Sequence, residues 1–238
     1  MSFTWAKFVV ALLVLASGSD AFADVVTVPN AAPGTLYRLV FVTSGTRDAQ
    51  SSNVSDYNAF ALAQANLSPQ LAALNTTWTA IGSTVVGSIT FNARDNTFSN
   101  PNTAAGVAFY QLDGLLIANN NADLWDGTLA ASISRDQLGG FHGNTSPVWT
   151  GTHHSGVASV NPLGGSASPF AQFGLPAQVG SGWVNTGSSN ISDGVADFNS
   201  MYAISGVLTI AVPEPSSLFL AGVGLFGLLR SRLRRTRA

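Results

Sequence analysis

Hydrophobic and polar positions along the chain predict short elements rather than long ones. The run LYRLVFV at residues 36–42 is rich in β-branched and aromatic side chains and is flanked by turn-forming residues, so it predicts a strand. Residues 55–64 place apolar side chains three and four positions apart, which predicts a helix with Ser55 as its N-cap. A second short helix is expected to begin at Pro69, with Ser68 as its cap.

The rest of the chain predicts short strands separated by long irregular segments. Apolar patterns predict strands at 78–81, 84–89, 148–152 and 201–210. In the last strand, one face is predicted to carry Tyr202, Ile204, Leu208 and Ile210. Residues 92–146 are rich in Asn, Asp and Gly, and we expect mostly loops there and in 153–200. Two early helices, short antiparallel strands and long loops predict an α+β domain.

Charged residues are few and unevenly distributed. Of the 238 residues, 46% are hydrophobic and only 9% are Asp, Glu, Lys or Arg, against about 25% in an average globular protein. Residues 24–212 contain four Arg, no Lys and ten Asp, which gives a net charge of −6. Such an acidic body repels phosphate backbones, so we expect no nucleic-acid partner. The absence of cysteine excludes disulfides, zinc–thiolate sites and thiol catalysis.

The N-terminal 23 residues have the features of a secretory signal peptide. Lys7 supplies the positive start, residues 8–16 are apolar, and an A-x-A site ends at Ala23. Cleavage is therefore predicted between Ala23 and Asp24. The alternative is an uncleaved anchor helix, for which the apolar run is short because a span needs about 20 residues.

The C-terminus joins a short apolar stretch to a basic tail. A helix is predicted over 216–229, which is marginal for crossing a hydrocarbon core of about 30 Å. The tail 230–238 then carries five arginines, which are Arg230, Arg232, Arg234, Arg235 and Arg237. By the positive-inside rule these arginines stay in the cytoplasm, and the body then lies outside the inner membrane.

Pro213, Glu214 and Pro215 precede the apolar stretch, and the prolines favour extended backbone that a protease can reach. The order Pro-Glu-Pro, apolar helix and arginine cluster over 212–238 resembles the PEP-CTERM sorting signal. This resemblance implies a bacterial exported protein that an exosortase, a membrane protease-transpeptidase, processes near the motif. Many proteins that such a signal marks belong to strains that make exopolysaccharide and biofilm matrix, so an exopolysaccharide partner is expected. The alternative is an ordinary tail anchor with a proline linker.

The body contains a series of stretches bearing Trp, Tyr and Gly between about residues 50 and 210. These stretches are Trp78–Ser83, Ala93–Asp95, Tyr110–Gly114, Ile117–Ala118, Ala122–Gly127, Val148–Thr152, Gly156, Trp183 and Met201–Ile204. In order and spacing they resemble the endostatin-like branch of the C-type-lectin-like superfamily. The resemblance implies that strand 36–42 pairs with strand 201–210, that both termini lie at one end, and that a surface of long loops points away from the membrane.

The sequence departs from that superfamily where its chemistry is concerned. Disulfides around the long loop are impossible without cysteine. The Glu-Pro-Asn or Gln-Pro-Asp loop and the Trp-Asn-Asp strand of calcium-dependent sugar-binding members are missing, and the only glutamate is Glu214. Sugar binding through the usual calcium site is therefore not expected.

Three aspartates and one tryptophan are the candidate ligand residues of the body. Asp113, Asp123 and Asp126 suit a structural Ca²⁺, or a pair of carboxylates for glycoside hydrolysis. The alternative is that they cap turns, since Asp113 and Asp126 each precede a glycine. Buried anchoring roles are expected for Trp78, Trp125, Trp149 and Trp183, and the alternative for Trp183 is an exposed ring that stacks on a sugar.

The chain has three histidines, His142, His153 and His154, and the adjacent pair His153 and His154 is expected to be exposed on a loop rather than to bind zinc or copper. Neighbours on a strand point to opposite faces, so His153 and His154 can share a metal ion only from a loop. No Gly-x-Ser-x-Gly elbow marks a serine nucleophile.

These features divide the chain into a signal peptide at 1–23, an exported C-type-lectin-like α+β domain at 24–211, and a sorting and anchor segment at 212–238. The predicted function is non-enzymatic, that of a transiently anchored surface or matrix protein that binds polysaccharide or protein. No cofactor is expected, and structural calcium is kept as an alternative. Two alternatives stay open, which are a surface or periplasmic hydrolase acting on matrix glycans and a matrix filler without a ligand.

Overall fold

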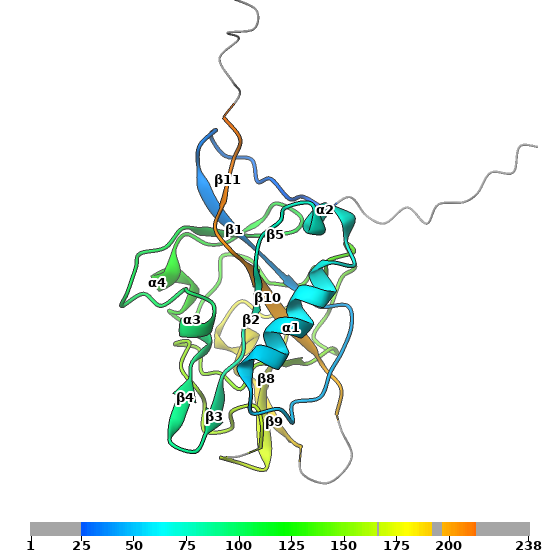
Figure 1. Cartoon of the computed structure of the whole chain (residues 1–238), viewed down its shortest axis with the longest axis vertical. Helices are drawn as coiled ribbons and strands as arrows, with labels where there is room; N and C mark the ends of the chain where they lie inside the picture. The colour runs from blue at the N-terminus through cyan, green and yellow to red at the C-terminus, as the bar shows by residue number, and fades with distance from the viewer. Residues whose placement is uncertain (1–24, 166, 192–196, 213–238) are drawn as a thin grey trace, which may run out of the picture.

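The structure is a computed structural model that describes residues 25–165, 167–191 and 197–212. Its strands are β1 (Leu36–Val42), β2 (Trp78–Ala80), β3 (Thr84–Val86), β4 (Ile89–Phe91), β5 (Ala108–Gln111), β6 (Leu116–Ala118), β7 (Val148–Trp149), β8 (Phe170–Gly174), β9 (Gly187–Asn190), β10 (Ser200–Ser205) and β11 (Leu208–Thr209). Its helices are α1 (Val54–Ala65), α2 (Pro69–Ala72), α3 (Ala93–Asn96), α4 (Asn121–Leu124) and the 3₁₀ turn η1 (Ser181–Trp183). Sheet therefore dominates the described residues, as Figure 1 shows.

Among the described residues, nine strands form one mixed sheet whose main path is β6-β5-β1-β10-β7-β8-β9. The predicted pairing of the first and last strands is confirmed, because β1 runs antiparallel to β10 and then to β11. The prediction of antiparallel strands is wrong for two pairs, since β1 is parallel to β5 and β10 is parallel to β7. Within each parallel pair, a long connection returns the chain to the end of the sheet at which the first strand began. A hairpin cannot do this, because it joins antiparallel strands.

Strand β1 lies inside the sheet and is buried on both faces. Leu39 and Phe41 point into one hydrophobic cluster, and Val40 and Val42 point into a second one across the sheet. Arg38 shares this burial, with its Nε donating to Ser205 O at 2.6 Å, and burial lowers the pKa of Arg38 to about 10. The alternation of side chains therefore explains why an almost continuous apolar run forms a central strand.

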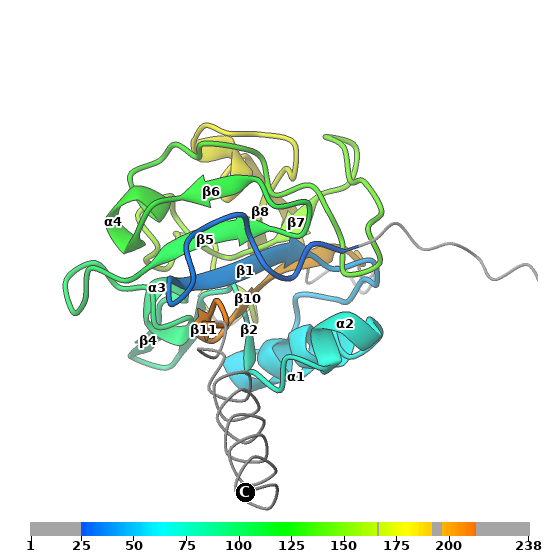
Figure 2. The same ribbon diagram turned by 90° about the horizontal axis from the view of Figure 1, so that it is seen from above.

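The two early helices are confirmed, with one correction to a cap. Helix α1 packs against β2 and β10 and buries Tyr57 and Ala61, and Figure 2 shows α1 and α2 together on one side of the β1–β10 pair. The N-cap of α1 is Asn53 rather than Ser55, because the Asn53 side chain accepts from the Ser55 backbone N–H. Ser68 caps α2 as predicted.

The strand predicted at 84–89 is instead the first part of a hairpin, β3–β4. Gly87 has a φ of +59°, which supplies the turn, and Ile89 and Phe91 beyond it are exposed. The loop prediction for 92–146 is wrong at β5 and β6, which lie in the main sheet, and the one for 153–200 is wrong at β8 and β9.

The last strand does not carry its apolar side chains on one face. Tyr202 and Ile204 belong to the cluster on one side of the sheet, whereas Ile210 belongs to the other, with Leu208 packed against it. The chain leaves the ladder at Gly206, which donates its N–H to Thr77 O, and then resumes as β11. Because of this break, the side chains of Leu208 and Ile210 lie on the opposite face of the sheet from those of Tyr202 and Ile204.

Several predictions concern residues that the structure does not describe. The signal peptide with its cleavage between Ala23 and Asp24, the Pro213-Glu214-Pro215 tripeptide, the apolar helix over 216–229 and the arginine tail all lie outside the described ranges. Within those ranges, no helix combines the length and the apolar character that crossing a bilayer requires.

Candidate functional site

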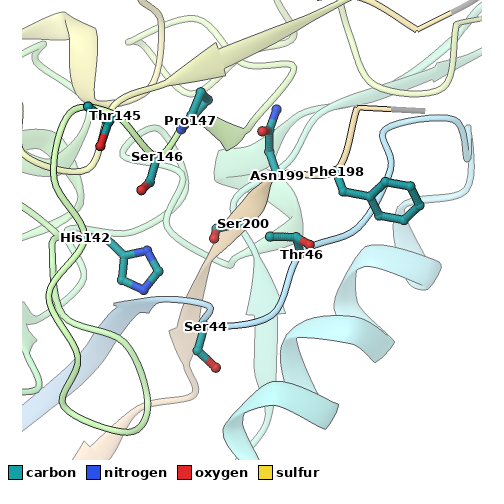
Figure 3. A pocket seen from close by; sticks show the side chains of 9 residues that line it. All are labelled: Ser44, Thr46, His142, Thr145, Ser146, Pro147, Phe198, Asn199 and Ser200. Carbon is teal, nitrogen blue, oxygen red and sulfur yellow. The ribbon is translucent and has the colours of Figure 1, made fainter. Parts of the chain in front are cut away.

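A polar hollow of about 270 Å³ lies beyond the C-terminal end of β1. Because β1 and β10 are antiparallel, the residues that follow β1 meet those that open β10, as in the bridge between Arg47 and Asn199. The loop before β7 closes the remaining side. Figure 3 shows the lining side chains, which are Ser44, Thr46, His142, Thr145, Ser146, Pro147, Phe198, Asn199 and Ser200.

Hydrogen bonds fix the walls of this polar hollow. The Thr43 N–H donates to Met201 O, and the Met201 N–H donates to the Thr43 hydroxyl at 2.9 Å. The buried amide of Gln137 holds Ser44 twice, since its Oε1 accepts from the Ser44 N–H and its Nε2 donates to the Ser44 Oγ at 2.6 Å. Gln64 of α1 accepts from the same Gln137 amide. The hollow is therefore preorganised by the sheet and by α1.

His142 is paired with a buried carboxylate. Its Nε2 lies 3.1 Å from Asp136 Oδ2, and the backbone N–H groups of Leu138 and Gly140 donate to Asp136 Oδ1. Burial alone would raise the pKa of Asp136, but these hydrogen bonds from His142 and the two amides outweigh it and lower the pKa. His142, for which the sequence indicated no role, is thus held in place by a buried carboxylate.

Asp136→Asn is expected to lower the free energy of unfolding by about 1–3 kcal/mol at neutral pH, because charge-assisted hydrogen bonds are lost. The depressed native pKa means that the carboxylate stabilises the fold above its unfolded pKa of about 4, and that this contribution is lost as pH falls through the native pKa. Urea unfolding from neutral pH to below about pH 3 should show the difference shrinking. A difference that stays constant over this range would contradict the role assigned to Asp136.

The three predicted aspartates each serve their own turn. Asp113 accepts from the Gln111 amide and the Leu115 N–H, and lies 3.6 Å from Arg135. Asp123 accepts from Asn119, and Asp126 accepts from the N–H and hydroxyl of Thr128. These contacts fit the turn-capping alternative. Across the described ranges, no three His, Asp or Glu side chains gather in a way that would hold a metal ion.

Trp183 has no exposed face for a sugar. Its side chain is 0% exposed and packs against Trp125 and Tyr202, with ring centroids 5.7 and 5.5 Å apart. Burial is also found for Trp78, Trp125 and Trp149, as predicted. The ring of Trp183, at a short 3₁₀ turn, fills the space between the loop and the sheet, so the expected anchoring role is confirmed and the sugar-stacking alternative is not.

His153 and His154 lie ring to ring, with centroids 3.9 Å apart, away from the polar hollow. His153 Nδ1 is 2.9 Å from the Ser155 hydroxyl. Burial and the neighbouring His154 lower the pKa of His153.

The role of Asp136 was not predicted from the sequence. The sequence feature that could have indicated it is the Gly139-Gly140 turn, which folds Asp136 back onto its own loop.

Comparison with family models shows that residues 211–235 match the PEP-CTERM protein-sorting motif. Comparison with curated proteins gives no match for the chain. The match confirms the sorting signal inferred from the Pro-Glu-Pro tripeptide, the apolar stretch and the arginines. It begins one residue after Ile210, the last buried residue of the body. This chain therefore carries a PEP-CTERM sorting signal and is an exported protein, processed by an exosortase, that is anchored in a membrane during sorting and then reaches the cell surface.

Proposed function

We propose that the body of this exported protein is a non-enzymatic binding module for neutral polysaccharide, and that the polar hollow is its binding site. The observation that carries the proposal is the chemistry of the lining. Five hydroxyl side chains and one amide, those of Ser44, Thr46, Thr145, Ser146, Ser200 and Asn199, line one cavity with no Asp, Glu, Lys or Arg among the lining residues. Hydroxyl and amide groups both donate and accept, as sugar hydroxyls do.

An exposed ring adds the apolar contact that a sugar needs. Phe198 is 59% exposed and is one of the lining residues, and in Figure 3 it stands at the rim with its ring turned outward from the other lining side chains. The C–H face of a pyranose can pack on such a ring, which contributes area that hydrogen bonds alone do not supply. The cavity is slightly smaller than the usual ligand pocket of about 300–1,000 Å³, so it suits one or two sugar units of a longer chain.

The proposed family of the body is the C-type-lectin-like superfamily in its endostatin-like branch. The pairing of β1 with β10 and β11 and the packing of α1 against the β2–β10 pair support this assignment. A ligand surface built from loops is also in keeping with it, because the hollow is lined by the loop before β7 and by the segments flanking β1 and β10. Structural calcium at loop carboxylates remains a separate proposal.

One observation favours a second function, that of a hydrolase that removes ester groups from matrix glycans. His142 lines the hollow together with three serines and is oriented by Asp136, which is how a general base is held. Hydrolysis would require one serine hydroxyl to approach His142, and no such hydrogen bond is formed among the described residues. The binding function therefore needs fewer assumptions about the same side chains.

Phe198→Ala is expected to weaken binding of a neutral oligosaccharide by about two- to tenfold, because one aromatic contact contributes about 0.5–1.5 kcal/mol. The full-length protein in detergent would first be screened on an array of neutral and uronic-acid oligosaccharides. Isothermal titration with the strongest neutral ligand then compares the wild type, Phe198→Ala and Asn199→Ala. Phe91→Ala serves as the matched control, since Phe91 is exposed on the β3–β4 hairpin, outside the hollow.

The same oligosaccharide separates the two functions. A binding module leaves an acetylated form of it intact, whereas a hydrolase of this kind releases acetate, and His142→Gln abolishes that release. If no oligosaccharide on the array binds, or if Phe91→Ala weakens binding as much as Phe198→Ala, the assignment of the hollow is wrong.

A further inference from the structure

The end of the domain at which the sorting motif begins is formed by β11 and the start of β1. Ile210 is buried there, with Gly34 donating to its carbonyl and its own N–H donating to Thr35 O. Val212 is exposed, two residues further on. Extended chain covers at most about 3.3–3.6 Å per residue, so the apolar stretch that follows Pro215 begins within about 20 Å of Ile210. A membrane holding that stretch is therefore close to this end of the domain.

We propose that this end is a membrane-facing surface, which we call the exit face and define by Pro33, Gly34, Leu36, Val207 and Val212. This inference rests on the sorting motif, whatever the hollow binds. The exposed fractions of Leu36, Val207 and Val212 are 48%, 57% and 63%. In Figure 1 β11 and the start of β1 lie together at one end of the domain.

The exit face is built from segments without charge. Asp, Glu, Lys and Arg are absent from residues 25–37, from 57–93 and from 198–213. The β11–β1 ladder, the turn at Gly34 and the contact of Gly206 with Thr77 all come from these segments. Bringing a surface against lipid headgroups strips water from it, which is costly for charged groups and nearly free for Val, Leu, Pro and Gly.

The charged residue of β1 itself, Arg38, is buried, and the partly exposed charged residues that follow β1 lie at its other end. Arg47 bridges to Asn199 at the start of β10, donates to Asp56 O and lies 3.6 Å from Asp48. The body as a whole carries a net charge of −6 between residues 24 and 212. A bilayer containing anionic lipids repels such a body least when its uncharged end is turned toward the lipid.

The apolar area of the exit face is too small to bind a membrane by itself. The tether changes this, because a short linker keeps the face at a high effective concentration beside the bilayer. Burial of a few aliphatic side chains at the interface then decides the orientation of the domain rather than its attachment. The polar hollow lies beyond the opposite end of β1 and so faces outward, away from the lipid.

Because the chain has no cysteine, single cysteines can be introduced and labelled cleanly. The full-length protein would carry an environment-sensitive fluorophore at Val207→Cys, in vesicles of phosphatidylethanolamine and phosphatidylglycerol with headgroup nitroxide lipids. We expect quenching severalfold stronger than for a label at Val160→Cys. Val160 is the matched control, because it is 86% exposed and lies in the loop before β8. Both positions are exposed, so both variants should unfold thermally as the wild type does.

Equal quenching at the two positions, in protein that floats with the vesicles, would overturn the proposal while leaving anchoring intact. Protein that does not float with the vesicles would overturn both. Pyrene at Val207→Cys tests for a second copy of the chain, since excimer emission would show that another molecule covers the exit face instead of lipid. The oligosaccharide titration is independent of all three outcomes.

Discussion

Trp183→Ala is expected to lower the free energy of unfolding by about 3–5 kcal/mol, a large part of the stability of a domain of this size. The indole fills the space between Trp125 and Tyr202 in the second hydrophobic cluster. Removing it leaves a cavity that the surrounding sheet cannot close, because β10 is held on both sides by hydrogen-bonded strands. Urea unfolding followed by far-ultraviolet circular dichroism measures the loss.

Trp183→Phe is the conservative variant. The indole N–H of Trp183 has no hydrogen-bond partner among the described residues, so phenylalanine loses packing volume but no hydrogen bond. We expect a cost well below that of alanine. Val160→Ala, at an exposed position, should change stability by less than about 0.5 kcal/mol. A cost for Trp183→Ala as small as that of Val160→Ala would contradict the buried position of the ring.

Gly151→Ala is expected to destabilise the fold by about 2–4 kcal/mol, from a strained backbone and a steric clash together. Gly151 has a φ of +59°, a region that residues with a side chain rarely occupy. An added Cβ would also lie 2.5 Å from Leu163 N and 2.5 Å from Ser83 O. Both are backbone atoms that cannot rotate away, and both are joined by the hydrogen bond that holds the 163 loop against the segment before β3.

Gly87→Ala separates the two causes. Gly87 has the same φ of +59°, but nothing lies within 4 Å of a Cβ built on it. This variant should therefore show only the backbone cost, about 1–2 kcal/mol. Thermal and urea unfolding measure the free energy of unfolding of both variants. The cost of the steric clash is the destabilisation by Gly151→Ala minus that by Gly87→Ala. If Gly87→Ala proves as destabilising as Gly151→Ala, close packing around Gly151 does not account for its cost.

The helices and the central strand were predictable because their signals are local. Ser68 and Pro69 mark the start of α2 through the chemistry of a helix N-terminus, which needs no distant partner. The run 36–42 predicts β1 because a strand buried on both faces needs an apolar residue at nearly every position. The cap of α1 was misplaced by two residues, since Asn53 and Ser55 are both good caps and only the backbone geometry separates them.

The breaks in the strands were not predictable from periodicity. A glycine inside an apolar run is compatible both with a continuous strand and with a turn. Gly87 therefore did not indicate that the residues after it leave the core. Gly206 likewise separates β10 from β11 because Thr77 accepts its N–H, and Thr77 is far away in sequence. The candidate site follows the same logic, since Ser44 and Asn199 meet only through the pairing of β1 with β10.

The sequence by itself determined the destination of this protein. The sorting motif acts as a linear order of proline, apolar and basic residues, and an order of that kind can be recognised without a fold. Tertiary structure alone decided which side chains share the polar hollow, that Asp136 holds His142, and that uncharged segments from different parts of the chain meet at the exit face. These depend on strand register and loop closure, which bring together residues whose separation along the chain carries no information about their distance in space.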